Sequence, residues 1–390
     1  MCGEERARFG KGVSTPEGHA FGVWFFMGHP LDEENMRIAL ALAQQGHPSP
    51  NPMVGAVVVK DGKIVGRGFH QAAGGPHAEV LALEEAGELA KGATLYVTLE
   101  PCAHYGRTPP CTEAIISAGI HRVVAPMEDP DPRVRGRGFT RLREAGIQVE
   151  VGLLAEEAEQ LNAAYLKHRR TGLPLVIVKW AMSLDGKIAT PTGESKWITG
   201  EEARELVHQM RSRCDAIAVG INTVLRDDPL LTARIPGGRD PLRVVVDSRL
   251  RIPLEAQVIT VPSQAATVVA TTSQAPMEKI HKLESRGVEV WVLDGPEGKV
   301  DLHRLLEELG RREILSVLVE GGGTLIAGFV EAGLVDRVAA FVAPLIIGGN
   351  GPSPVQGVGV ASLAEALHLT KVSIRQVGRD VLIEGVLRRA

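Results

Sequence analysis

The sequence has few aromatic residues, no excess of positive charge, few cysteines and no long apolar run. Aromatic residues make up 4% of the 390 residues, and the formal net charge at pH 7 is -4. Proteins that bind nucleic-acid strands usually combine a basic groove with stacking aromatic side chains, so this composition argues against a polynucleotide substrate. No apolar stretch approaches the roughly 20 residues that cross a bilayer. Four cysteines do not make a disulfide framework, and we expect a cytoplasmic protein with reduced thiols.

The length predicts two domains, because single hydrophobic cores stop growing at about 250–300 residues. The turn-forming run Thr171-Gly172-Leu173-Pro174 places the boundary, giving domains over 31–172 and 173–390. Residues 1–30 fit neither domain, since their apolar run Phe21 to Met27 is too short for a standard signal peptide. We interpret 1–30 as a disordered leader or an overlong start.

Strands and helices alternate along both halves, which predicts an α/β fold with layered sheets. In the first half, strands are expected at 54–60, 63–69, 93–99, 121–126 and 148–151, and helices at 31–46, 76–91, 138–146 and 155–170, with one more opening at Pro109-Pro110. Asp32 is expected to cap the first helix, and Asp61-Gly62 to turn a hairpin. In the second half, strands are expected at 175–182, 216–220, 244–247, 267–271, 288–293, 315–320, 338–343 and 381–386, and a helix capped by Thr199 at 201–214.

One His and two Cys in the first half form a candidate zinc site. His77 follows Pro76 at an expected helix start, Cys102 follows a buried strand, and Cys111 opens the helix after Pro109-Pro110. Three such ligands leave a fourth tetrahedral position open for water, as in catalytic zinc sites. Glu79 lies two residues after the His, where a carboxylate can move protons without binding the metal. The pattern H-x-E…P-C is typical of zinc-dependent base deaminases.

Two features leave other interpretations open. Isolated His and Cys are usually structural, and a structural zinc site would need a fourth protein ligand, for which His104 is the candidate. The two cysteines are also separated by eight residues, whereas the general deaminase pattern has two.

Three glycines in VLVEGGGTLIAGFV lie between an apolar strand and a helix. Backbone can approach a phosphate there, and the helix N-terminus favours an anion. The pattern is not G-x-G-x-x-G, so it does not indicate a Rossmann fold, and a tight structural turn explains it equally well.

Several long motifs together resemble one known family. PNPMVGAVVVKDGKIVG, GGPHAEVLAL, TLEPCAHYGRTPPC, MSLDGKIAT, GESKWIT, TVLRDDPLLTAR and VEGGGTL occur in this order over residues 31–390. They are similar to the RibD family of bifunctional riboflavin-biosynthesis enzymes, whose longer loop between the cysteines accounts for the eight-residue spacing.

The resemblance implies a cytidine-deaminase-like three-layer α/β/α domain followed by a dihydrofolate-reductase-like α/β domain. The first would deaminate a diamino-hydroxy-phosphoribosylaminopyrimidine, with one Zn²⁺ held by His77, Cys102 and Cys111 and with Glu79 as the catalytic proton carrier. Asn51 and His70 would bind this substrate. Arg107 would pair with its phosphate, although a solvated loop charge is the plain alternative.

The second domain would use NADPH to reduce the ribosyl group of the resulting aminouracil to ribityl. The resemblance implies these cofactor contacts: Ala181, Trp197, Thr223, Asp227, Ser248, Gly322, Gly323, Thr324, Leu325, Ile326, Ala327 and Gly328. It implies these substrate contacts: Ser195, Arg211, Leu231, Arg234 and Glu320. Trp197 could instead belong to the core, and water or Asp227 are the candidate proton donors. The family also implies a homodimer or homotetramer formed through this domain.

Two other functions compete with this interpretation. A nucleic-acid base deaminase would need the basic groove and stacking aromatics that the composition lacks. A zinc-stabilised binding protein for pyrimidine nucleotides would not need Glu79 beside an open metal position. Partners are therefore expected to be small molecules, with no nucleic acid and no membrane.

Overall fold

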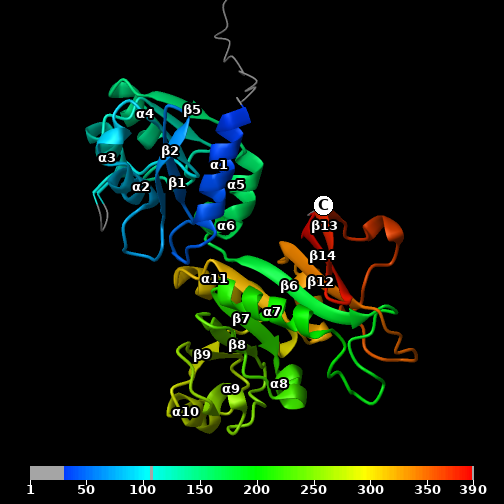
Figure 1. The fold of residues 1–390 in the computed structure, drawn as a ribbon. Coiled ribbons are helices and arrows are strands. Elements are labelled where there is room, and N and C mark those ends of the chain that lie inside the picture. The colour runs from blue at the N-terminus through cyan, green and yellow to red at the C-terminus, as the bar shows by residue number, and fades with distance from the viewer. Residues whose placement is uncertain (1–29, 106–108, 389–390) are drawn as a thin grey trace, which may run out of the picture.

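The computed structural model describes residues 30–105 and 109–388, which form two α/β domains, each built on its own sheet (Figure 1). The two-domain expectation is confirmed. The leader expected at 1–30 lies, except for Pro30, outside the described residues.

The first sheet has five strands in the order β2-β1-β3-β4-β5. Their bounds are β1 Gly55–Lys60, β2 Lys63–Phe69, β3 Thr94–Val97, β4 Arg122–Ala125 and β5 Gln148–Val151. The strands β1 and β2 form the expected antiparallel hairpin, and Asp61 and Gly62 turn it with φ of 49° and 75°. The strands β3, β4 and β5 run parallel, so their carboxyl ends meet at one edge of the sheet.

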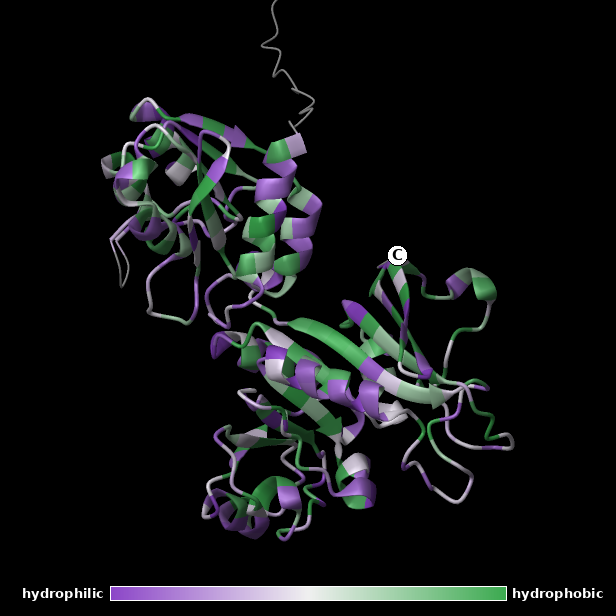
Figure 2. Ribbon diagram, viewed as in Figure 1, coloured by the Kyte–Doolittle hydropathy of each residue, from purple (hydrophilic) through white to green (hydrophobic). Residues whose placement is uncertain are grey.

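Helices cover both faces of this sheet, which confirms the three-layer architecture. On one face lie α1 (Pro30–Ala43) and α5 (Ala155–Leu161); on the other lie α2 (Ala78–Ala86), α3 (Cys111–Ser117) and α4 (Arg137–Glu144). Alternation along β3 sends Leu95 and Val97 to the second layer and Tyr96 to the first, as the two-residue period of a strand requires. Figure 2 shows hydrophilic and hydrophobic residues alternating along α1, as expected for a helix with one buried face.

Two local expectations in this domain are wrong. Asp32 does not cap α1, which already includes Pro30; its carboxylate instead accepts hydrogen bonds from Arg122 and from the Tyr96 hydroxyl. The single helix expected over 155–170 is broken at Asn162 into α5 and α6 (Ala163–Thr171). The Asn162 amide group donates to the carbonyl and accepts from the N–H of Met53, and this pairing fixes the break.

The second sheet has nine strands in the order β10-β9-β8-β7-β11-β6-β12-β14-β13, parallel from β10 to β12. Their bounds are β6 Leu175–Ser183, β7 Ala216–Gly220, β8 Leu242–Val246, β9 Thr267–Thr271, β10 Glu289–Val292, β11 Ser316–Glu320, β12 Arg337–Ala343, β13 Leu369–Val377 and β14 Asp380–Leu387. The helices are α7 Glu201–Arg213, α8 Ile221–Asp227, α9 Gln257–Thr260, α10 Met277–Glu284, α11 Leu302–Arg311 and α12 Gly323–Glu331. Short 3₁₀ turns lie at Gly87–Ala90, Pro296–Gly298 and Leu363–Glu365.

Two features of this domain differ from expectation. The strand β13 was not expected, because its residues are almost all exposed and show no one-sided apolar pattern. Thr199 does not cap α7; the N-cap is Gly200, whose N–H donates to Asp380 Oδ2 at 2.7 Å.

The two domains meet along α6 and the end of α11. On α6, Lys167 forms an ion pair with Asp336, and His168 Nε2 lies 2.9 Å from the carbonyl oxygen of Gly310. Leu315, which precedes β11, packs into the same hydrophobic cluster as Tyr165 of the first domain. One side chain of the second domain, that of Leu315, therefore belongs to the core of the first.

Among residues 30–105 and 109–388, no helix is both long and apolar enough to span a bilayer.

Substitution of Gly310 with Ala tests the domain contact. A Cβ at this position would lie 1.9 Å from the carbonyl oxygen of Gly172, so backbone must shift. Overpacking typically costs about 1–3 kcal/mol, which outweighs the roughly 1 kcal/mol that Ala gains over Gly within a helix. We expect Gly310→Ala to lower the midpoint of urea unfolding, with Glu307→Ala on the exposed face of α11 as the unaffected control. An unchanged or higher midpoint would contradict this packing.

Candidate active sites

His77, Cys102 and Cys111 converge on one point. Their ligand atoms all lie within 4.8 Å of one another, with His77 Nδ1 at 3.2 Å from Cys111 Sγ and 3.6 Å from Cys102 Sγ. Zn–N and Zn–S bonds of about 2.0 and 2.3 Å in a tetrahedron place N and S roughly 3.5 Å apart, so the observed spacing fits zinc. His104 lines the adjacent cavity but does not belong to this cluster of ligand atoms.

Each ligand is positioned where a helix or strand ends. The helix expected from Pro76 begins at Ala78, so His77 is the N-cap of α2 and not part of its first turn; Cys102 follows the loop after β3; Cys111 is the first residue of α3. The N–H of Cys111 also approaches Cys102 Sγ at 3.4 Å. Helix N-termini favour negative charge, which stabilises thiolates at this point.

The pKa values of the Cys102 and Cys111 thiols shift in opposite directions because the two sulfurs share a hydrogen bond. A hydrogen bond from Cys111, together with contact to His77, lowers the pKa of Cys102 to about 4. The hydrogen bond to Cys102 and burial raise the pKa of Cys111. A pair of sulfurs with one proton between them is the arrangement that a divalent cation replaces, since metal binding releases ligand protons.

Glu79 is buried, with 3% of its surface exposed, in the first turn of α2. Burial is the main cause that raises the pKa of its carboxyl to about 7. A carboxyl group that gains and loses a proton near neutral pH is suited to general acid–base catalysis.

A cavity of about 460 Å³ opens onto His77, Glu79 and Cys102. Asn51 and His70 also line it, as the resemblance implied. His70 Nδ1 lies 2.9 Å from the carbonyl oxygen of Pro76 and Nε2 lies 3.0 Å from Asn51 Nδ2. Burial lowers the pKa of His70, so the neutral ring donates from Nδ1 and accepts from Asn51, which leaves the Asn51 carbonyl oxygen for a ligand. Arg107 lies outside the described residues.

The Glu100 carboxylate fixes the loop that forms the far wall of this cavity. Its two oxygens accept hydrogen bonds from four backbone N–H groups, those of Asp129, Gly136, Gly138 and Phe139, at 2.8–3.2 Å. The zinc-bearing segment and the 129–139 loop are thereby held together through a single side chain.

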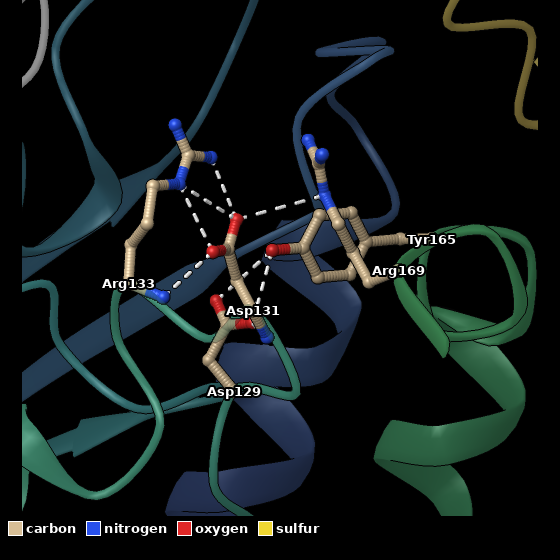
Figure 3. Close-up of polar contacts among 5 residues, drawn as sticks. All are labelled: Asp129, Asp131, Arg133, Tyr165 and Arg169. Atoms are coloured by element: carbon tan, nitrogen blue, oxygen red, sulfur yellow. Dashed lines mark hydrogen bonds and ion pairs between the residues drawn. The ribbon is translucent and has the colours of Figure 1, made fainter. Parts of the chain in front are cut away.

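A polar cluster on this loop was missed by sequence reasoning (Figure 3). The Tyr165 hydroxyl donates to the Asp129 carboxylate at 2.9 Å, and Arg133 Nη2 pairs with Asp131 Oδ2 at 2.6 Å. Arg169 of α6 lies with Nε 3.8 Å from Asp131 Oδ2. Burial raises the pKa of Asp129 to about 6, whereas hydrogen bonds from Arg133 lower the pKa of Asp131 to about 2. The run Asp129-Pro130-Asp131-Pro132 after a strand was the available signal.

The second domain holds two adjoining cavities at the carboxyl ends of its parallel strands, about 510 and 540 Å³ in volume, which share Thr223, Asp227, Gly322 and Gly323. The glycine turn after β11 has Gly321 and Gly322 at φ of 76° and 78°, and α12 begins at Gly323. These residues expected at the reductase site line one or both cavities: Ala181, Ser195, Trp197, Arg211, Thr223, Asp227, Leu231, Arg234, Ser248, Glu320, Gly322, Gly323, Thr324, Leu325, Ile326 and Gly328. Ala327 is buried and lines neither cavity.

Trp197 is not a core residue, because 65% of its surface is exposed and the Arg204 guanidinium lies over its ring at 4.7 Å.

Charged side chains meet at the floor of the first of these cavities. Arg211 pairs with Glu320 through two hydrogen bonds of 2.8 and 2.7 Å. Despite burial, the charges of Arg211 and Lys179 lower the pKa of Glu320 to about 2, while burial lowers the pKa of Lys179. Arg234 is exposed, and its Nη2 lies 3.2 Å from His208 Nε2. Sequence reasoning missed Lys179, since a single Lys within the apolar strand β6 carries no motif.

The comparisons with known proteins match both domains. Residues 30–127 match the cytidine and deoxycytidylate deaminase zinc-binding region, and residues 174–383 match the RibD C-terminal domain. The chain is 47% identical to riboflavin biosynthesis protein RibD of Aquifex aeolicus over 90% of this chain and 98% of that protein. It is 44% identical to the RibD protein of Escherichia coli over 91% of this chain and 99% of that protein.

Solved structures agree over nearly the whole chain. Acinetobacter baumannii RibD has a TM-score of 0.82 at 39% identity, covering 92% of this chain and 99% of that one. A Thermotoga maritima diaminohydroxyphosphoribosylaminopyrimidine deaminase/5-amino-6-(5-phosphoribosylamino)uracil reductase has a TM-score of 0.81 at 37% identity, with the same coverage.

Fold, metal-ligand geometry and matches together define a zinc-dependent deaminase joined to an NADPH-dependent reductase. The protein is therefore a bifunctional enzyme, with one activity in each domain. The chain belongs to the RibD family of riboflavin-biosynthesis enzymes.

Glu79→Gln tests the role of the buried carboxyl. The substitution keeps the shape of the side chain but removes its ability to exchange a proton, so we expect unchanged zinc content and a loss of deamination of at least about a hundredfold. Zinc is measured by elemental analysis and deamination by ammonia release. A rate within about tenfold of the wild type would show that Glu79 does not carry the proton.

Proposed function

We propose that the first domain deaminates a diamino-hydroxy-phosphoribosylaminopyrimidine and that the second reduces the ribosyl group of the resulting aminouracil to ribityl. The observation that carries this proposal is the cluster of His77, Cys102 and Cys111, of which His77 and Cys102 line one cavity together with Glu79. The substrates are those that the name of the Thermotoga maritima relative describes.

In the deaminase, we assign metal binding to His77, Cys102 and Cys111. When bound, zinc acts as a Lewis acid that makes water nucleophilic at neutral pH. Glu79 is placed to take the proton that water would lose as its oxygen adds to the amine-bearing ring carbon, and to give that proton to the amine nitrogen as the C–N bond breaks. Ammonia would then leave, and the oxygen would stay on the ring. Asn51 presents its carbonyl oxygen to the pyrimidine and His70 holds the Asn51 side chain in that orientation. We retain Arg107 as a phosphate contact on resemblance alone.

In the reductase, we assign NADPH binding to the cofactor residues named above, with the positive-φ turn at Gly321 and Gly322 admitting the phosphates to the N-terminus of α12. When bound, NADPH supplies the hydride. Ser195, Leu231 and Arg234 hold the substrate. Ala327 shapes this site only through its packing in α12.

Lys179 is our candidate for the proton donor to the ribose, ahead of water or Asp227. It is partly buried on β6 at the wall of the cavity, and its charge interacts with Glu320. Burial lowers the pKa of its ammonium group, which makes the group a better acid. Arg211 keeps Glu320 ionised through its two hydrogen bonds, and so sets the charge that Lys179 faces.

Assembly and location complete the proposal. We infer a homodimer or homotetramer formed through the second domain, supported by exposed apolar Ile374 on the edge strand β13 and by exposed Val358 and Leu363 in the segment that precedes this strand. We place the enzyme in the cytoplasm, since its metal site needs reduced cysteines. The domain boundary near Gly172 is supported by the end of α6 at this residue, with φ of 74°.

Removal of zinc should separate the two activities. After treatment with a chelator we expect ammonia release to stop, while NADPH oxidation on supplied deaminated substrate continues at the untreated rate. Re-addition of about one Zn²⁺ per chain should restore deamination. Full deamination by a chain shown by elemental analysis to hold no metal would contradict the assignment.

Two arginines of the reductase should behave differently. Arg234→Ala removes an exposed cation, so we expect the KM of the reductase to rise about tenfold with kcat nearly unchanged. Arg211→Ala should also reduce kcat, because it leaves buried Glu320 without its partner. Deamination should be normal in both variants. Equal loss of both activities would indicate that the substitutions act through folding.

A further inference from the structure

The deaminase cavity contains two cations that the assignments above do not use. Besides His77, Glu79 and Cys102, its described lining includes Arg133 and Arg169, and no other Arg or Lys. Arg133 belongs to the 129–139 loop fixed by Glu100, whereas Arg169 comes from α6, far along the sequence. Figure 3 shows the two guanidinium groups on either side of Asp131.

Asp131 holds both arginines in place. Its carboxylate accepts from Arg133 Nε at 3.0 Å and Nη2 at 2.6 Å, and it lies 3.8 Å from Arg169 Nε. The Arg169 guanidinium also lies over the Tyr165 ring at 5.2 Å. The Asp131 side chain is 6% exposed, so the carboxylate that both arginines approach is itself shielded from solvent.

The arginines keep unused N–H groups. Arg133 Nη1 and the three guanidinium nitrogens of Arg169 have no hydrogen-bond partner within 30–105 and 109–388. The Arg169 side chain is 21% exposed and the Arg133 side chain 65% exposed, so both can reach a ligand in the cavity. Two guanidinium groups around one point match the planar, bidentate recognition of phosphate.

Two nearby carboxylates, Glu100 and Asp129, accept their hydrogen bonds from other groups and none from either arginine. Glu100 is saturated by its four backbone donors, and Asp129 accepts from Tyr165 and from the N–H of Asp131. Asp131 neutralises one of the two arginines, so one net positive charge remains among these three side chains. Glu313, at the rim, is exposed, where water and salt screen its charge.

We propose that Arg133 and Arg169 bind the phosphate group of the deaminase substrate, and that Asp131 is the positioning residue that orients both guanidinium groups. The inference rests on the proposed function, which supplies a phosphorylated pyrimidine. It assigns two phosphate contacts beyond Arg107, one of them from the helix that joins the domains.

The contacts on α6 explain how Arg169 is held rigidly. Lys167 and His168, the two preceding residues, are anchored to Asp336 and to the Gly310 carbonyl of the second domain. One end of the phosphate site therefore depends on the docking of the reductase domain.

The test compares a phosphorylated substrate with its dephosphorylated counterpart in ammonia-release kinetics. We expect Arg133→Ala and Arg169→Ala each to raise the KM for the phosphorylated substrate about tenfold, and the double variant roughly a hundredfold, with kcat within about threefold. Kinetics on the dephosphorylated substrate should not change. Arg169→Lys should recover part of the loss, because it keeps the charge but not the fork of donors.

Arg170→Ala is the matched control. Arg170 is the next residue on α6, is exposed and pairs with Glu159 at 3.7 Å, and we expect wild-type kinetics. Inorganic phosphate should inhibit the wild type competitively and the double variant at least tenfold more weakly, since it probes the same contacts.

Asp131→Ala tests the positioning role. It should raise the KM for the phosphorylated substrate although it removes a negative charge; a lower KM would show that Asp131 only competes with the phosphate. An unchanged KM in the double variant, or an equal loss on the dephosphorylated substrate, would overturn the phosphate site while leaving the deaminase assignment intact. A wild-type enzyme that releases no ammonia from the phosphorylated substrate would instead refute the proposed function.

Discussion

The first domain depends on one buried carboxylate, that of Glu100. It lies three residues after the end of β3 and directly precedes Pro101 and Cys102, and its two oxygens accept hydrogen bonds from four backbone N–H groups of the 129–139 loop. An ionised group removed from water is costly unless its lone pairs are filled, and here they are filled entirely by main chain. This explains why a metal ligand and the polar wall of the substrate cavity, which come from different parts of the chain, keep a fixed spacing. Substitution of Glu100 would therefore change the cavity and the metal site together.

In the second domain, a buried carboxylate is stabilised instead by an ion pair with an arginine. Glu320 ends the buried strand β11, and Arg211 from α7 binds it with two hydrogen bonds before the glycine turn begins. In both domains an acidic residue at or just beyond the carboxyl end of a parallel strand holds a neighbouring element beside the site. Glu100 holds the 129–139 loop, and Glu320 holds the helix α7. The two folds thus place their chemistry at the same kind of sheet edge, in agreement with the general behaviour of α/β proteins.

Much of this could be predicted from sequence because the signals were local. Asp61-Gly62 predicted the hairpin, and the residue types of His77, Cys102 and Cys111 predicted the metal site. The resemblance to the family predicted residues such as Ser248, Thr223 and Leu231, which line the two cavities of the second domain. The predictions that were wrong or missing concern residues whose role depends on partners far away in the sequence. Asp32 and Thr199 are residue types that often cap helices. In the structure, however, the Asp32 carboxylate binds Arg122, and Asp380 accepts from the N–H of Gly200, which caps α7 in place of Thr199. In the sequence, Arg169 and Tyr165 show only the pattern of ordinary helix residues. Their contacts with Asp131 and Asp129 become visible only in the folded structure. The strand β13 was not predicted, because its residues between the two ends are exposed to solvent.

The contribution of Leu315 to the first domain's core has a consequence for how the gene could be divided. A fragment ending at the boundary near Gly172 would retain every metal ligand, yet it would lose this side chain from the layer that also holds Tyr165 and Leu166. It would lose the anchors of Lys167 and His168 as well. A free-standing deaminase derived from this sequence would need a new apolar cap over the exposed hole. The two domains are therefore not independent units joined only by the chain. Residues of the reductase domain contribute to the structure of the deaminase domain.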